Sequence, residues 1–167
     1  MRYEGVIATA PVEADTNYVE AGGVTIGVER RTLDAATVLA VMDQRNVRDE
    51  ERDQYLTEMP HVKAGGAEQF LSVHVFGPDR SEYLRFDNID GGRTPHYHYL
   101  APQENFYTVE SYDVEANGNF IDWTLHCLQN HLEPMLRKAH ADDVADEIDR
   151  LALDAALVEV RELVVNS

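Results

Sequence analysis

The segment from residue 68 to residue 115 constrains the fold of this chain more than any other. Four stretches of strand-like alternation lie within it, separated by the turn residues Gly77-Pro78-Asp79-Arg80 and Gly91-Gly92. The stretches cover residues 70–76, 82–87, 94–100 and 105–115. Short strands that follow one another so closely pair as antiparallel neighbours. The segment therefore predicts a β-meander.

The part of the chain before the meander predicts strands and one helix. Residues 24–29 alternate as a half-buried strand does, and residues 3–9 do so more weakly. Asp34 is a suitable N-cap for a helix that follows, and Pro60 marks the predicted end of that helix. The sequence thus predicts one helix inserted early, between the first strands and the meander.

The segment after the meander fits two secondary structures. Asn117-Gly118 is typical of a type I′ hairpin turn, which would lead into one more strand. We predict a strand to about His126 and then a helix to His140, with Pro134 as a local disturbance. A helix fits the apolar residues equally well: Ile121, Leu125, Leu128, Leu132 and Leu136.

The last helix, predicted as one piece over residues 144–164, has two apolar stripes. The first stripe is Val144, Ile148, Leu151, Ala155 and Val158; the second is Leu153, Leu157, Val160 and Val164. Because one core rarely needs so wide an apolar face, we predict a homodimer with the Leu157 stripe at its interface. The 167 residues thus predict a single α+β domain over residues 1–167. Its antiparallel meander has about six or seven strands, with one early helix and two C-terminal helices.

Charge and composition narrow the function classes. The formal net charge is −17, so nucleic acid and anionic membranes are disfavoured partners. No apolar run reaches the ~18 residues of a membrane span, and the start of the chain has no signal-peptide pattern. With Cys127 as the single cysteine, these features predict a cytoplasmic protein. Phosphate-binding, dinucleotide-binding, serine-hydrolase and zinc-helix motifs are absent, and no nucleotide cofactor is predicted.

The most informative motif is a pair of histidines two residues apart. His96 and His98 point to the same face of a strand, where their rings can chelate a metal. Glu104 and His126 are the further predicted ligands of one divalent metal ion. The order His-x-His, Glu, His, with Asn130 following, resembles the metal motif of the cupins, whose small β-barrels hold a divalent ion with such a set. The spacing before the Glu and the glycines of that motif differ, and two C-terminal helices do not suit a plain barrel.

A plainer interpretation of the same strand competes with the metal site. Tyr97 and Tyr99 would face the core, and the two histidines would lie on the solvated side. His74, at the centre of a strand, is predicted to be a hydrogen-bonded core histidine. Asp87, near the Gly91-Gly92 turn, belongs to an acidic cluster that chance explains in a chain with 31 acids.

Two function hypotheses follow from these features. The leading one is a non-catalytic or accessory homo-oligomeric protein that binds a partner or a small ligand. The alternative is a metal-dependent enzyme acting on small molecules, with His96, His98, Glu104 and possibly His126 around the ion. The sequence leaves open whether the protein is an enzyme, and it names no catalytic residue.

Overall fold

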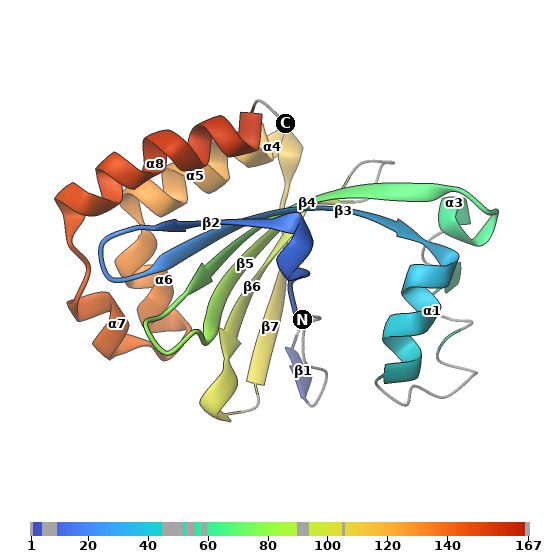
Figure 1. The fold of residues 1–167 in the computed structure, drawn as a ribbon, viewed down its shortest axis with the longest axis horizontal. Helices are drawn as coiled ribbons and strands as arrows, with labels where there is room; N and C mark the ends of the chain where they lie inside the picture. The colour runs from blue at the N-terminus through green and yellow to red at the C-terminus, as the bar shows by residue number, and fades with distance from the viewer. Residues whose placement is uncertain are drawn as a thin grey trace.

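A computed structural model describes residues 2–4, 10–44, 52, 56–57, 60–89, 94–104 and 106–165. Its centre is an open antiparallel sheet with helices packed on one face (Figure 1). The strands lie in the order β1-β7-β6-β5-β4-β3-β2, so β2 to β7 form a meander and β1 pairs with β7 at the edge. This confirms the predicted α+β meander. The strands are β1 (Arg2–Glu4), β2 (Thr16–Glu20), β3 (Thr25–Asp34), β4 (Ala67–Phe76), β5 (Glu82–Ile89), β6 (His96–Ala101) and β7 (Phe106–Ser111).

A β-bulge interrupts the pairing of β4 with β5. Val75 pairs with Leu84, but Phe76 pairs with Glu82, so Tyr83 has no partner opposite it on β4. An extra residue in one strand reverses the faces to which the residues beyond it point. As a result, Glu82 joins the face that carries Arg85, while Tyr83 belongs to the apolar core on the other face.

The structure of the early helical region confirms the predicted N-cap. Asp34 accepts a hydrogen bond from the backbone N–H of Thr37 at 2.7 Å and caps α1 (Ala35–Gln44). Pro60 is the first residue of the short α3 (Pro60–Lys63), a position at which a proline needs no N–H. Much of the predicted helix between α1 and Pro60 lies outside the described residues. The 3₁₀ turn η1 (Glu13–Asp15) and strand β2 were not predicted.

The predicted Asn117-Gly118 hairpin is wrong. Asp113 caps the short α4 (Val114–Asn117) through the N–H of Ala116, and Asn119 caps α5 (Phe120–Asn130) through the N–H of Asp122. Gly118 has φ +81° because it ends α4, so its conformational freedom serves a helix terminus instead of a hairpin. His126 is therefore helical, not on a strand.

Two of the three breaks between the C-terminal helices bear on the sequence predictions. The first separates α5 from α6 (Leu132–Lys138) at His131, because the ring of Pro134 would clash with the carbonyl of Asn130 in a continuous helix. The second separates α7 (Asp142–Asp146) from α8 (Arg150–Val165), so the predicted single helix over residues 144–164 is wrong. Between α7 and α8, the backbone N–H of Asp149 donates to the carbonyl of Gly22 at 2.9 Å.

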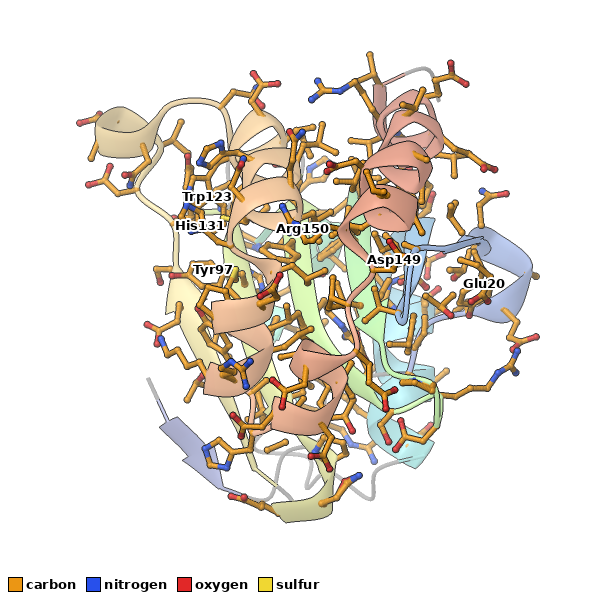
Figure 2. The ribbon with its side chains drawn as sticks, turned by 90° about the vertical axis from the view of Figure 1, so that its left-hand side faces the viewer. Glu20, Tyr97, Trp123, His131, Asp149 and Arg150 are labelled. Atoms are coloured by element: carbon orange, nitrogen blue, oxygen red, sulfur yellow. The ribbon has the colours of Figure 1, made fainter. Side chains whose placement is uncertain are left out.

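The apolar core lies between the sheet and helices α5, α6, α7 and α8, and we call this side of the sheet the helix face. Trp123 of α5 packs against Tyr97 of β6 with their ring centroids 4.9 Å apart, as Figure 2 shows from the helix side. A small separate cluster of Val38, Met42 and Val62 joins α1 and α3 at the far end of β3 and β4. Among the described residues, no helix is both long enough and apolar enough to cross a membrane.

The orientation of α8 corrects the predicted subunit interface. The stripe with Leu153 and Leu157 is buried in the core of the chain itself, so it is not free to contact a second subunit. The exposed apolar residues of α8 are Leu151, Val158 and Val165, with Leu151 84% exposed. The homo-oligomer itself stays a prediction.

Candidate metal site on the polar face of the sheet

The face of the sheet opposite the helices carries a cluster of ionisable and polar side chains, which we call the polar face. Alternation along four neighbouring strands places them there, since their sequence neighbours Val28, Val73, Phe86 and Tyr97 point into the helix-face core. All of the cluster except the half-buried His96 is buried. The polar face consists of Glu29, Ser72, His74, Arg85, Asp87, His96 and His98.

The register of the sheet arranges the polar face in two rows. Ser72, Asp87 and His96 lie opposite one another across β4, β5 and β6. His74, Arg85 and His98 form the parallel row two residues further along each strand. Directly opposite residues have Cβ atoms about 4.5 to 5.5 Å apart, close enough for their polar ends to interact.

One carboxylate lies between the two histidines of the His-x-His motif. Oδ2 of Asp87 is 3.0 Å from Nε2 of His98 and 3.4 Å from Nε2 of His96. The other oxygen, Oδ1, accepts a hydrogen bond from the hydroxyl of Ser72 at 2.5 Å. The two imidazole rings stand edge to face with centroids 5.0 Å apart. Three ligand-type atoms therefore converge on one point of the polar face.

Electrostatics keep this carboxylate ionised. Burial alone would raise the pKa of Asp87, but the hydrogen bonds from His96 and His98 and the charge of Arg85 hold it well below its ordinary value. An ionised carboxylate can accept hydrogen bonds from imidazole N–H groups or donate its lone pairs to a cation. Nδ1 of His98 is buried and has no hydrogen-bond partner in the structure as described.

A second group of charges lies beside the first. Nδ1 of His74 is 2.6 Å from Oε1 of Glu82, and its Nε2 is 3.2 Å from Oε2 of Glu29. Arg85 donates to both oxygens of Glu82, at 2.8 Å from Nε and 2.6 Å from Nη2. His74 is fully buried and bonded through both nitrogens, which confirms the prediction of a core histidine.

The pKa values of this second group describe an ion cluster. Burial favours neutral His74, but the hydrogen bonds to Glu29 and Glu82 outweigh it and raise the pKa of the imidazole. Burial likewise opposes ionisation of the two glutamates, but chiefly the bond from His74 lowers the pKa of each. Arg31 adds a further positive charge 3.8 Å from Glu29. The group therefore holds its charges in compensating pairs.

The four predicted metal ligands fall in three places. His96 and His98 lie together, as the motif predicts, and Asp87 joins them. Glu104 belongs to the 3₁₀ turn η2 (Pro102–Glu104), and its carboxylate is 2.6 Å from Nδ1 of His140. His126 is exposed on α5 beside Asn130. The structure thus does not bring Glu104 or His126 to the histidine pair.

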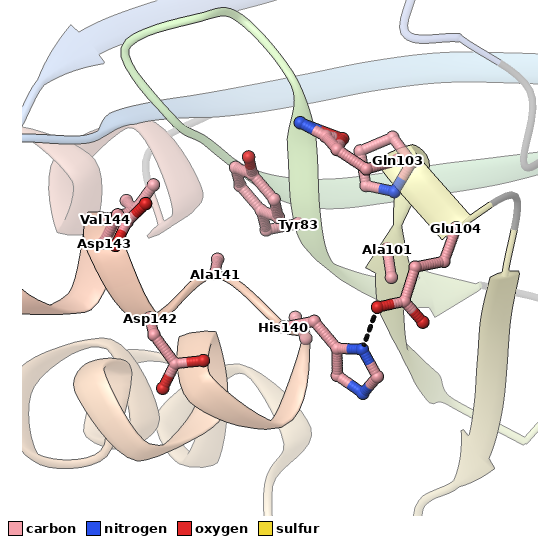
Figure 3. A pocket seen from close by; sticks show the side chains of 11 residues that line it. Tyr83, Ala101, Gln103, Glu104, His140, Ala141, Asp142, Asp143 and Val144 are labelled. Atoms are coloured by element: carbon pink, nitrogen blue, oxygen red, sulfur yellow. Dashed lines mark hydrogen bonds and ion pairs between the residues drawn. The ribbon is translucent and has the colours of Figure 1, made fainter.

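A hollow in the described surface is separate from the polar face. It has a volume of about 320 Å³ and lies between the start of β5, turn η2 and the loop joining α6 to α7. Figure 3 shows Glu104 and His140 at one side of it and Tyr83 at its back. The three ligand-type atoms of Asp87, His96 and His98 converge outside this hollow.

The plainer interpretation of the histidine strand is half correct. Tyr97 and Tyr99 pack on the helix face as it predicts. His96 and His98, however, are 21% and 10% exposed in their side chains and lie against a carboxylate instead of bulk solvent. Strand alternation alone predicted their shared face, whereas their burial depends on the rest of the fold.

Comparison with known proteins identifies a family but no function. Residues 18–164 match the model of a family described as a domain of unknown function, DUF7700. No curated protein and no solved structure shows a significant match.

Proposed function

We propose that this chain, which belongs to the DUF7700 family, binds one divalent transition-metal ion through Asp87, His96 and His98 and uses it in chemistry on a small molecule. This is the metal-enzyme hypothesis with a different ligand set, because Asp87 takes the place of Glu104 and His126. The proposal favours that hypothesis over the non-catalytic one.

The separation of the ligand atoms carries the proposal. Ligand atoms about 2.1 Å from an ion, at angles of roughly 90° to 109°, lie about 3.0 to 3.4 Å from one another. The Asp87 oxygen is 3.0 Å and 3.4 Å from the two Nε2 atoms, and one ligand atom from each residue lies within 4.8 Å of the others. The side chains need little rearrangement to accept an ion.

The type of ligand supports a transition metal and a reactive site. The two imidazole nitrogens, which Ca²⁺ and Mg²⁺ rarely accept, make Fe²⁺ or Zn²⁺ the better match for this set of two imidazoles and one carboxylate. Three protein ligands leave at least one coordination position for water or substrate, as catalytic sites require. Ser72 supports the arrangement, since its hydroxyl orients the carboxylate through the oxygen that faces away from the histidines.

Metal titration of untagged protein tests the proposal. Protein stripped with EDTA should bind one Zn²⁺ or Co²⁺ per chain, and bound Co²⁺ should give a visible spectrum that reports nitrogen and oxygen ligands. His96→Gln should weaken binding at least tenfold, by loss of one of three ligands. His126→Gln is the matched control, because His126 is exposed on α5. Binding that is absent in the wild type, or equally strong in both variants, would refute the site.

A further inference from the structure

The polar face contains a third imidazole, that of His74, whose charge state should respond to the metal. His74 lies in the row with Arg85 and His98, so it is two strands away from His98. Neighbouring strands are about 4.8 Å apart, which places His74 about 10 Å from the candidate metal site. His74 contacts neither Asp87 nor the two histidine ligands in any described interaction; its nitrogens bond to Glu29 and Glu82.

The ion pairs around His74 match positive and negative charge before any metal enters. Glu29, Glu82 and Asp87 are matched by Arg31, Arg85 and the imidazolium form of His74. The buried Glu68, on the same face of β4 as His74, adds one more carboxylate to this side of the sheet. A divalent ion adds two positive charges to this poorly solvated surface, where charges interact over longer distances than in water. The arginines cannot lose their protons. His74 is therefore the cation that can restore the balance.

We propose that metal uptake at Asp87, His96 and His98 expels a proton from His74; this inference rests on the proposed metal site. The N–H bond at Nε2 breaks, its electron pair stays on the nitrogen, and the proton passes to the solvent buffer. Nε2 is the site of loss because its contact with Glu29 is 3.2 Å, against 2.6 Å for Nδ1 with Glu82. Glu29 remains compensated by Arg31 and by the N–H of Val12 at 2.8 Å.

The groups facing His74 fix the direction of the effect. From β3 it faces Glu29, which Arg31 contacts in turn, and from β5 it faces Glu82 and Arg85. Glu82 keeps its two bonds from Arg85 and the remaining Nδ1–H after the proton leaves. The metal adds positive charge to the same side of the sheet, so it can only favour the neutral ring. Metal affinity should in consequence rise with pH through a residue that is not a ligand.

Nitrogen NMR of the wild-type protein tests the inference directly. With ¹⁵N-labelled histidine at pH 7, the ring of His74 should show two protonated nitrogens before metal and the Nδ1–H tautomer after one equivalent of Zn²⁺. A parallel calorimetric titration in two buffers of different ionisation enthalpy counts the protons released. His74→Gln should release fewer protons per Zn²⁺, by up to one, while His126→Gln should release as many as the wild type.

The outcomes separate this inference from the proposed function. Zn²⁺ that binds at the three ligands while His74 stays doubly protonated overturns the coupling and leaves the metal site intact. Absence of Zn²⁺ binding overturns both. The NMR measurement uses the unaltered chain, so it decides the coupling even where His74→Gln fails to fold.

Discussion

Replacing His74 with glutamine should cost this protein a large part of its stability, and the cost should depend on pH in a defined direction. The imidazole is fully buried between two carboxylates, at 2.6 Å from Glu82 and 3.2 Å from Glu29. Removal of one partner from a buried ion pair costs about 3 to 5 kcal/mol because the other charge is left unpaired. Arg31 and Arg85 still neutralise part of the negative charge that Glu29 and Glu82 would carry without the imidazolium. We therefore expect the substitution to lower the free energy of unfolding by about 3 kcal/mol at pH 6.

The sign of the pH dependence follows from the direction of each pKa shift. The pKa of His74 is raised from its ordinary 6.5, so its contribution is complete below that pH and is lost as the pH rises through the folded value. The pKa values of Glu29 and Glu82 are lowered from 4.5, so their contributions are complete above that pH and are lost on acidification. The cluster should therefore stabilise the fold most between pH 4.5 and 6.5.

Urea denaturation at a series of pH values from 5 to 9 measures this effect. The wild type should lose free energy of unfolding above pH 6.5, whereas His74→Gln should show a shallower decline because no imidazolium is left to lose its proton. His126→Gln serves as the control, since its exposed ring should leave the whole profile unchanged. An alkaline decline of equal slope in wild type and His74→Gln would refute the reasoning.

Three further predictions concern the helix face and the surface. Leu153→Ala should cost about 2 to 5 kcal/mol in urea denaturation, whereas Leu151→Ala should change stability by less than about 0.5 kcal/mol, because the first is fully buried and the second is 84% exposed; equal effects would contradict the orientation of α8. Gly22→Ala should lower the melting temperature, because its φ is +61° and a Cβ would lie 2.4 Å from the carbonyl oxygen of Asp149; an unchanged melting temperature would contradict that close approach. Added NaCl should raise the melting temperature by screening the net charge of −17; a constant or lower value would count against self-repulsion.

The meander could be predicted from sequence because local signals and long-range pairing agree there. Alternation along each strand and the Gly77-Pro78 and Gly91-Gly92 turns predict the same antiparallel neighbours. Strand β2 escaped notice because Thr16–Glu20 has one buried residue and so carries little apolar alternation. Its pairing with β3 is set by the fold instead.

The region after β7 was misassigned because one sequence signal fits two structures. A glycine that follows an asparagine tolerates the positive φ of a hairpin and equally that of a helix terminus. Here Asp113 and Asn119 act as N-caps on either side of Gly118 and settle the choice in favour of helices. Asp113 and Asn119 each accept a hydrogen bond from the backbone N–H three residues later. These two N-cap residues are the sequence signal that favours helices over a hairpin in this region.

The position of Asp87 beside His96 could have been found by counting across a turn. A two-residue hairpin centred on Gly91-Gly92 places residues 87 and 96 opposite each other, which is the observed pairing of Asp87 with His96. Glu104 and His126 were chosen instead because their order matches a barrel motif. In an open sheet, Glu104 lies in a turn beyond the end of β6, and His126 lies on a helix across the other face.

The bulge between β4 and β5 determines which changes in chain length this protein can tolerate. Pairing from Val75 and Leu84 toward Phe70 and Ile89 is continuous, so lengthening or shortening the tip at residues 77–81 leaves Asp87 opposite Ser72. Deletion of Tyr83 would remove the bulge and leave Glu82 opposite Phe76 on the face that carries Arg85, but it would take the Tyr83 ring out of the helix-face core. Natural variation in loop length should therefore accumulate at the tip, whereas the count of residues between Leu84 and Asp87 should remain fixed wherever Asp87 stays opposite Ser72.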